Sequence, residues 1–322
     1  MQQDNGTHPE GPGEFSQDPA GLNGSYFMKR REEKYDMPIG AAAFVRNEVE
    51  QHLPLFEFRK GNRHTYITTV YFDNEKLDFY QKAKAYYDDN LKIRVKEYYY
   101  QGPAGASSPW FVFDYCFLEI KQRIQGLVVK RRFEMPKVLL GRLLRGEDIW
   151  DDLVASRSGM EFHGVIDVYR EFRWFLQRYQ VNAKSIINYR RSVYQEDEHE
   201  LRITFDDEIA VFAPPPQLYE KTQSLARSFL GEPDRVFSHV IMEIKCQNGY
   251  PEWLSRLLRT HAPKRFSKFT SSLNVLTQEL PQPVTKASPP YSPPPTPPGG
   301  SFTHLEESQA SGDTTQVADI KL

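Results

Sequence analysis

The sequence has only two cysteines among its 322 residues, Cys116 and Cys246. They lie far apart in apolar runs, which excludes a disulfide framework and a paired-cysteine metal site, so we expect two reduced thiols in the core. No stretch of about 18 apolar residues is present, and the first residues lack a basic segment followed by an apolar one. We therefore expect neither a membrane span nor a signal peptide, and we predict a cytoplasmic location.

Neither sign of charge is in large excess, since 41 Lys and Arg stand against 43 Asp and Glu, a formal net charge of -2. The chain as a whole lacks the field that would attract it to nucleic acid or to an anionic membrane. Also missing are a P-loop, a dinucleotide-binding glycine motif, a zinc-binding HExxH motif and a serine-hydrolase motif, and the eight histidines are scattered. Any anion site must therefore arise from local segregation of charge.

The two ends of the chain differ in composition from its middle. Residues 1–24 are rich in Gly, Pro, Asp, Asn and Gln, and we expect a disordered arm. Residues 281–322 begin with a proline-rich stretch that cannot bury a core. We expect a solvated tail there, with a docking motif for a proline-reading domain as the alternative. Residues 25–280 are expected to form one folded region.

Hydrophobic periodicity predicts an α+β fold. Helical spacing of apolar residues occurs at 39–53, 136–153, 160–179, 218–230 and 252–259, and segment 160–179 also fits a strand and a turn. Alternation with β-branched and aromatic residues predicts strands at 65–72, 91–100, 110–123, 127–133, 185–194, 201–206 and 240–246. Several short strands with few helices between them favour an antiparallel sheet or barrel over βαβ units.

Several of these strands have one apolar face and one charged face, because side chains alternate along a strand. From residue 91 to residue 96 the odd positions are apolar and the even positions are basic. The charged positions on the predicted strands include Lys92, Arg94, Lys96, Glu119, Lys121, Arg123, Lys130, Arg132, Arg202, Glu243 and Lys245. A solvent-exposed charged face is the ordinary interpretation of such a pattern.

Two observations favour an enclosed charged face instead. Cations outnumber anions on these faces although the chain is slightly acidic, and neighbouring like charges on a sheet repel unless they have a partner. The two carboxylates Glu119 and Glu243 each stand in a Glu-Ile-Lys sequence, and isolated carboxylates among cations suit a divalent metal on a phosphate substrate. Closing the sheet would turn the charged face inward and line a tunnel for a polyanion. Residues 263–269 add further cations, with an exposed basic turn as the alternative.

Short motifs then carry a resemblance to a known family. They are EKY at 33–35, VYFDN at 70–74, FY at 79–80, KIRVK at 92–96, FLEIK at 117–121, KRRF at 130–133, YRR at 189–191, LRITFD at 201–206, MEIK at 242–245 and FSKF at 266–269. In this order and number they resemble the vacuolar transporter chaperone (VTC) domain, the polyphosphate polymerase branch of the triphosphate tunnel metalloenzymes. The resemblance extends from about residue 33 to residue 276.

The resemblance implies an antiparallel β-barrel with a basic lumen and peripheral helices. It also implies transfer of the terminal phosphoryl group of ATP to a growing polyphosphate chain, with a divalent metal, Mn²⁺ or Mg²⁺. Carried over by motif, the catalytic cations would be Arg94, Lys96, Lys121, Arg191, Arg202 and Lys268. Further phosphate-binding cations would be Lys34, Lys92, Lys130, Arg190, Lys245 and Arg265. Glu243 would be the metal ligand, assisted by Glu119, and which of Arg190 and Arg191 faces the lumen stays open.

The sequence departs from related proteins at several points. The related CYTH branch carries two glutamates and a lysine at alternate positions, where this chain has Arg30, Glu32 and Lys34, which argues against a CYTH-type triphosphatase or cyclase. Lys96 replaces the second arginine of an Arg-x-Arg strand, and bidentate geometry is lost with it. A phosphate-sensing SPX domain and membrane helices are not found in the sequence, so coupling to membrane transport would require a membrane-protein partner subunit.

More than one class of function is compatible with these residues. The first is an ATP-dependent polyphosphate polymerase. The second is a module that binds polyphosphate or inositol phosphates without turnover, and the third is a triphosphatase that uses the same tunnel. Glu243 favours an enzyme, because the binding of anions alone does not need a carboxylate among cations.

Overall fold

The computed structural model describes residues 24–28, 31–102, 108–125, 127–156, 164–196, 201–216, 218–219, 224–247 and 249–278. Apart from Gly24, with which the first strand begins, the predicted N-terminal arm and the Pro-rich tail lie outside these residues. None of the helices in the described ranges combines the length and the apolarity needed to cross a membrane.

An antiparallel sheet forms the centre of the fold, and eleven strands of it lie within the described residues. They are β1 Gly24–Met28, β2 Arg31–Pro38, β3 Thr65–Asp73, β4 Asn90–Gln101, β5 Trp110–Val112, β6 Tyr115–Ile124, β7 Leu127–Pro136, β8 Asn182–Glu196, β9 Leu201–Phe212, β10 Arg235–Val236 and β11 His239–Cys246. The hydrogen-bonded order is β1-β7-β6-β4-β3-β8-β9-β11-β2, with β5 beside β4 and β10 beside β9. The predicted antiparallel sheet is confirmed.

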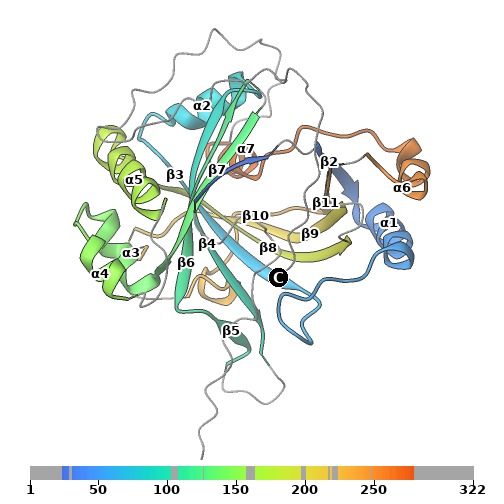
Figure 1. Cartoon of the computed structure of the whole chain (residues 1–322), viewed down its shortest axis with the longest axis horizontal. Helices are drawn as coiled ribbons and strands as arrows, with labels where there is room; N and C mark the ends of the chain where they lie inside the picture. Colours follow the sequence, from blue (N-terminus) through green and yellow to red (C-terminus); the bar gives the residue numbers. More distant parts are fainter. Residues whose placement is uncertain are drawn as a thin grey trace, which may run out of the picture. The chain divides into compact units, whose positions relative to one another are not determined.

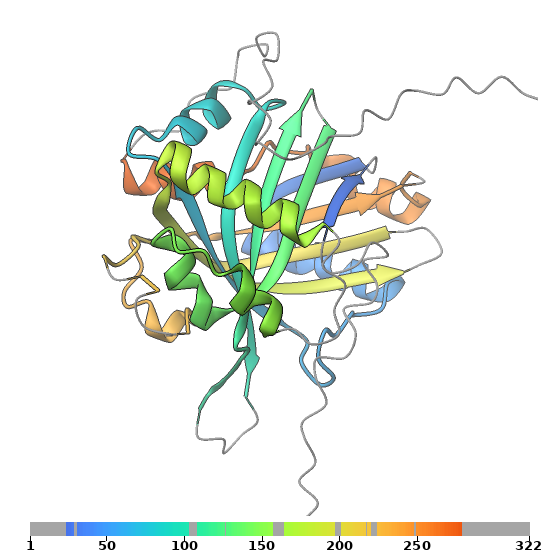
Figure 2. The same cartoon turned by 60° about the vertical axis from the view of Figure 1, so that its left-hand side comes forward.

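Helices pack against this sheet in two groups (Figure 1). They are α1 Ile39–His52, α2 Asp78–Ala85, α3 Lys137–Leu144, α4 Trp150–Ala155, α5 Val165–Tyr179, α6 Glu252–Leu257 and α7 Lys268–Leu276, with 3₁₀ turns at Arg227–Phe229 and Leu258–Thr260. Figure 2 shows α5 lying across the strands, and the larger apolar core lies under α2, α3, α4, α5 and α7. A second core joins α1 and α6 to β2, β9 and β11.

The predicted separation of faces is present on β4. Ile93 and Val95 are fully buried in the larger apolar core. Arg94 and Lys96 point the other way and line a cavity on the inner side of the sheet. The helices therefore remove the apolar face from water, and the charged face is left on the inside, as the alternation predicted.

The sheet is rolled, but its strand pairing does not close. Strands β6 and β2 stand six steps apart in the hydrogen-bonded order, a separation of about 29 Å in a flat sheet. Nevertheless Nζ of Lys121 on β6 lies 3.8 Å from a carboxylate oxygen of Glu32 on β2. Within the described residues no pairing joins β1 to β2 at the two ends of the order. The predicted closed barrel is therefore not confirmed, and the strands form an open, rolled sheet.

Two predicted elements are each divided in two. The helix predicted at 136–153 is interrupted by Gly146, which has a φ of 88° and so favours glycine. The amide of Gly146 bonds to the carbonyl of Leu143, and that of Glu147 bonds to the carbonyl of Arg142, the pattern that terminates helices in a left-handed residue. The strand predicted at 110–123 is divided into β5 and β6.

Other predictions were incomplete. Segment 160–179 is helical from Val165 onwards, and its first residues, 160–163, lie outside the described ones. The helix predicted at 218–230 is reduced, among the described residues, to the 3₁₀ turn at 227–229. The prediction at 252–259 is present as α6 and the 3₁₀ turn after it. Strands β1, β2 and β10 and helices α2 and α7 were not predicted.

The VYFDN motif has a structural explanation in Asp73. Its carboxylate is completely buried and accepts backbone hydrogen bonds from Asn74 at 2.8 Å, Phe79 at 3.1 Å and Tyr80 at 2.8 Å. The carboxylate thereby satisfies amides at the start of α2 that have no partner within the helix. Asp73 fixes α2 against the end of β3 and does not belong to the charged inner face.

Candidate functional site

Two rows of paired charged residues cross the inner face of the sheet. In one row Lys92, Lys121 and Lys130 are direct cross-strand partners on β4, β6 and β7. In the next row Glu119 stands between two arginines. Directly opposite side chains on a sheet have Cβ atoms about 5 Å apart, and like charges in such positions repel. The row of three lysines is therefore stabilised by anionic partners, and within the protein Glu32 lies 3.8 Å from Lys121.

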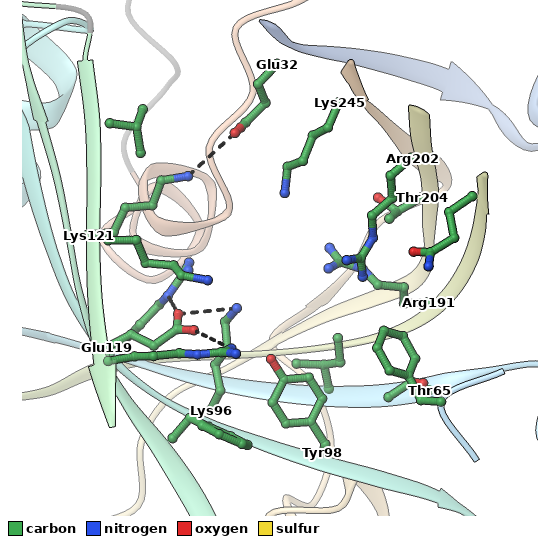
Figure 3. A pocket seen from close by; sticks show the side chains of 18 of the residues that line it. Glu32, Thr65, Lys96, Tyr98, Glu119, Lys121, Arg191, Arg202, Thr204 and Lys245 are labelled. Atoms are coloured by element: carbon green, nitrogen blue, oxygen red, sulfur yellow. Dashed lines mark hydrogen bonds and ion pairs between the residues drawn. The ribbon is translucent and has the colours of Figure 1, made fainter. Parts of the chain in front are cut away.

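Apart from Lys92, which lies beside it, these rows form one wall of a cavity of about 330 Å³, which we call the charged cavity. Nine cations and two carboxylates line it: Arg94, Lys96, Lys121, Arg123, Lys130, Arg132, Arg191, Arg202, Lys245, Glu32 and Glu119. Figure 3 shows that Lys96, Lys121, Arg191, Arg202 and Lys245 approach a common space from opposite walls. The large excess of cations suits this cavity to a polyanion.

The structure brings eight of the predicted site residues together in this lining. They are Arg94, Lys96, Glu119, Lys121, Lys130, Arg191, Arg202 and Lys245. The strands that carry them are separated by up to about 150 residues in the sequence, so only the roll of the sheet assembles them.

Glu119 is an ionised anchor for the cations around it and is only 1% exposed. Its carboxylate accepts a hydrogen bond from Arg94 Nε at 2.6 Å and lies 3.4 Å from Lys96 Nζ and 3.8 Å from Arg132 Nη1. Burial alone would raise the pKa of Glu119, but Arg94 and Lys96 hold it well below its ordinary value. Because both oxygens face cations, these contacts favour a role in fixing the cations over a role in metal binding.

Replacing Glu119 by Gln should destabilise the fold. The change removes the charge that compensates three buried cations, and breaking a buried ion pair typically costs about 3 kcal/mol or more. Urea unfolding would measure this loss, and we expect the variant to bind inorganic triphosphate at least as tightly as the unchanged protein. Glu147→Gln breaks an exposed ion pair with Arg142 and serves as the control, with an expected unchanged urea midpoint. A normal midpoint for Glu119→Gln would contradict the anchoring role.

A pair of carboxylates lies where β2 meets β11. Glu32 and Glu243 interact electrostatically, and each is held by lysines. Glu32 lies 3.3 Å from Lys34 Nζ and 3.8 Å from Lys121 Nζ, and Glu243 lies 2.8 Å from Lys245 Nζ. Burial and Glu243 act to raise the pKa of Glu32, but the lysines lower it to about 2. The pKa of Glu243 is also held well below its ordinary value despite burial, so both carboxylates are ionised at neutral pH.

This carboxylate pair fits a divalent metal that shares its ligands with a substrate. Among the described residues no three His, Cys, Asp or Glu side chains come together as a metal site. Mg²⁺, however, is commonly bound by one or two carboxylates and completed by substrate phosphates and water. Thr204 is the cross-strand partner of Glu243, and its buried hydroxyl lacks a hydrogen-bond partner within the described part of the chain. Glu32, Glu243 and Thr204 thus supply oxygen atoms that a metal with bound phosphate would use.

Burial and neighbouring cations disfavour the charged form of three lysines at the site. Burial lowers the pKa of Lys96 well below its ordinary value, and Arg94 lowers it further. Burial likewise lowers the pKa of Lys92, with contributions from Lys34 and Lys121. For Lys121 burial outweighs the favourable effect of Glu32 and lowers the pKa to about 8. A bound polyanion would favour the charged form of each lysine.

Arg191 and Arg190 lie on opposite sides of β8. Arg191 lines the charged cavity and donates two hydrogen bonds to Asp206, from Nε at 2.6 Å and from Nη2 at 2.7 Å. Arg190 is absent from the lining and pairs instead with Asp207 at 2.8 Å and Glu208 at 2.9 Å. The structure therefore places Arg191 in the cavity. The ion pairs of Arg190 argue against its predicted phosphate-binding role.

The remaining predicted residues lie beside the lining. Lys268 forms an ion pair with Asp206, next to Arg191. Lys92 donates a hydrogen bond to Ser267 Oγ at 3.1 Å, and Lys34 donates one to the carbonyl of Phe266 at 3.4 Å. Lys34 thereby connects the segment before α7 to the carboxylate pair. The side chain of Arg265 is exposed, lies over the ring of Tyr87 and is not part of the lining.

Several lining residues were missed as site residues. Arg123 and Arg132 stood on the predicted charged faces but were not assigned a role. Glu32 was considered only at the point where the sequence departs from the CYTH motif. The aromatic residues Phe56 and Phe58 come from the loop between α1 and β3, and Arg202 lies over the Phe58 ring at 5.6 Å. No sequence signal connected this loop to the cavity.

One comparison with known proteins agrees with the ordered motifs. A family model described as VTC domain matches residues 29–277. No curated protein matches the chain. Among solved structures, a protein of Pyrococcus horikoshii OT3 is similar with 11% identity and a TM-score of 0.37, covering 77% of this chain and 99% of that one. A candidate adenylate cyclase from Bacillus halodurans has 12% identity and a TM-score of 0.40, covering 77% and 98%.

The antiparallel sheet rolled around a cation-lined cavity defines a polyanion-binding domain. The VTC domain model matches most of the chain, and the chain therefore belongs to the VTC domain family. The family predicted from the order of the motifs is confirmed.

Proposed function

We propose that the chain is an ATP-dependent polyphosphate polymerase that transfers the terminal phosphoryl group of ATP to a growing polyphosphate chain in the charged cavity. The observation that carries this proposal is the row formed by Lys92, Lys121 and Lys130. Three like charges in register destabilise a sheet. A chain of phosphates in the cavity would neutralise Lys121 and Lys130, which line it, with Lys92 beside the lining. Membership of the VTC domain family supports the same function.

The transfer itself needs positioning and charge stabilisation more than it needs a protein nucleophile. An anionic oxygen at the end of the polyphosphate chain attacks the γ-phosphorus of ATP. A new P–O–P bond forms, the bond from the γ-phosphorus to the bridging oxygen breaks, and ADP leaves with that oxygen. No proton has to be removed from the attacking oxygen. Arg94 and Arg191 are held by Glu119 and Asp206 and would bind phosphate oxygens of the reacting group.

Glu32, Glu243 and Thr204 would hold a divalent metal at the edge of the charged cavity where β2 meets β11. When bound, such a metal supplies charge neutralisation at the transferring phosphoryl group. Lys34 and Lys245 already compensate the two carboxylates. These lysines would turn to phosphate oxygens when the carboxylates bind metal.

The proposal is tested by incubating the full-length protein with ATP and either Mn²⁺ or Mg²⁺, followed by electrophoresis and polyphosphate staining. We expect a ladder of polymer that lengthens with time. Release of phosphate from inorganic triphosphate without polymer would identify a triphosphatase instead. Binding of polyphosphate with neither product would identify a binding module, and the proposed polymerase would be wrong.

Affinity for inorganic triphosphate should fall as the pH rises. The pKa of Lys121 is lowered to about 8, so the lysine loses its positive charge above that pH. At pH 9 about one tenth of it is protonated, and the Kd should rise about tenfold relative to pH 7. Lys121→Arg stays charged and should show a smaller rise. Titration calorimetry at the two pH values checks this, and equal affinities would contradict the proposed contact.

A further inference from the structure

Two arginines lie over the ring of Tyr87 at one side of the charged cavity. The guanidinium carbon of Arg123 is 4.7 Å from the ring centroid, and that of Arg265 is 4.6 Å from it. Tyr87 precedes β4, Arg123 lies near the end of β6, and Arg265 lies shortly before α7. Three segments that are distant in the sequence thus converge on one aromatic ring. The proposed transfer gives this cluster no role.

The cluster adjoins the carboxylate end of the charged cavity. Arg123 lines the cavity and stands two residues after Lys121 on the same face of β6, about 7 Å along the strand. Lys121 is in turn 3.8 Å from Glu32. Tyr87 also interacts electrostatically with Lys34, which pairs with Glu32. A triphosphate bound at Glu32 therefore has the Tyr87 cluster as a neighbour.

The chemistry of the cluster suits a planar group better than a phosphate. A phosphate chain has no flat face and uses the charge and the N–H groups of a guanidinium, whereas a planar ligand can also use its flat side. A guanidinium held over a tyrosine presents a flat surface, and nucleic-acid bases stack on both arginine planes and aromatic rings. Arg265 is exposed, so a base arriving from solvent can reach it.

We propose that Tyr87, Arg123 and Arg265 form a nucleobase-stacking site, which holds the base of a nucleoside triphosphate while its phosphates enter the charged cavity. This inference rests on the proposed function, because it requires a triphosphate at the end of the cavity near Glu32. It assigns Arg265 to the base of the donor nucleotide instead of to its phosphates. The site would distinguish a nucleotide donor from the polyphosphate product, which shares only the phosphates.

The test compares ATP with inorganic triphosphate as ligands of the full-length protein. Titration calorimetry in EDTA, which prevents turnover, gives the ratio of the Kd for triphosphate to the Kd for ATP. We expect Arg265→Ala and Tyr87→Leu each to lower this ratio about tenfold by weakening ATP alone, the scale of one lost base stack. Lys264→Ala removes an exposed cation one residue earlier and should leave the ratio unchanged. Tyr87→Phe keeps the ring and should also keep the ratio.

The outcomes separate this inference from the function on which it rests. Triphosphate binding at the unchanged level shows that a variant is folded and that its cavity is intact. If both ligands bind the unchanged protein and neither Arg265→Ala nor Tyr87→Leu alters the ratio, the stacking site is wrong and the proposed function stands. If the unchanged protein binds neither ligand, both proposals are wrong.

Discussion

Replacing Glu243 by Gln should lower the rate of polyphosphate synthesis from ATP at least about a hundredfold, while inorganic triphosphate still binds. The change keeps the size of the side chain but removes the charge that a divalent metal requires. Loss of a negative charge beside Lys34 and Lys245 should leave triphosphate binding unchanged or tighter. Rates from polyphosphate-stained gels and affinities from calorimetry in EDTA measure the two effects separately. Glu32→Gln should behave in the same way.

Glu33→Gln is the matched control for these two changes. Glu33 follows Glu32 on β2, but its carboxylate accepts hydrogen bonds from the hydroxyls of Tyr35 and Tyr250 at 2.8 and 2.7 Å. Because successive side chains on a strand point to opposite faces, the change should not reach the charged cavity. We expect synthesis at close to the unchanged rate. Synthesis by Glu243→Gln at the rate of Glu33→Gln would contradict the assignment of Glu243.

Arg191→Ala should reduce polyphosphate synthesis about a hundredfold, whereas Arg190→Ala should leave it within about twofold. The two residues are neighbours in the sequence, yet only Arg191 lines the charged cavity. Removal of one preorganised group that stabilises developing charge typically costs about 10²–10³ in rate. Arg190 is paired with Asp207 and Glu208 on the other side of β8. Gel assays under identical conditions compare the two variants directly.

These two variants need a control for folding, because Arg191 also compensates the negative charge of Asp206. Asp206 keeps the ion pair with Lys268 in Arg191→Ala, so its charge is not left without a partner. Arg191→Lys retains a cation but loses the two parallel hydrogen bonds, and we expect intermediate activity. Circular dichroism of all three variants establishes that they are folded. Equal losses in Arg190→Ala and Arg191→Ala would contradict the assignment of the inward face.

Alternation alone was sufficient to predict the faces of the strands with a strict period of two. From residue 91 to residue 96 every second side chain is basic. Of the apolar ones, Ile93 and Val95 are buried in the core and Leu91 packs against it. The same alternation correctly placed Glu119 on the charged face of its strand. At Arg190 and Arg191 it could not, because two adjacent arginines fit either face equally well. The partners in the structure, Asp206 for Arg191 and Asp207 for Arg190, separate them.

The contribution of β2 could not be predicted from periodicity. Its sequence, REEKYDMP, is mostly charged and contains proline, so it does not resemble a strand. Pairing with β11 makes it one, and the register sets Glu32 opposite Lys245 and Lys34 opposite Glu243. The carboxylate pair that best fits a metal therefore depends on a long-range contact. The anchoring of Arg94, Lys96 and Arg132 by Glu119 depends on register in the same way.

Helix α7 shows a different limit. The segment from 263 to 269 was predicted to add cations, with an exposed basic turn as the alternative, and no helix was predicted there, but α7 begins at Lys268. Ser267 caps it by accepting a hydrogen bond from the amide of Thr270. The helix places Phe269 and Leu273 in the larger apolar core and leaves Lys268 to pair with Asp206. Helix α7 has only about two turns, so too few apolar residues recur at helical spacing for periodicity to predict it.

A crystal structure with inorganic triphosphate and Mn²⁺ would test the central claim most directly. Anomalous scattering locates the metal independently of the phosphates. We expect one Mn²⁺ between Glu32 and Glu243, with the triphosphate in the charged cavity among Arg94, Lys121 and Arg191. A metal bound at Glu119, or a triphosphate bound outside the cavity, would contradict the account.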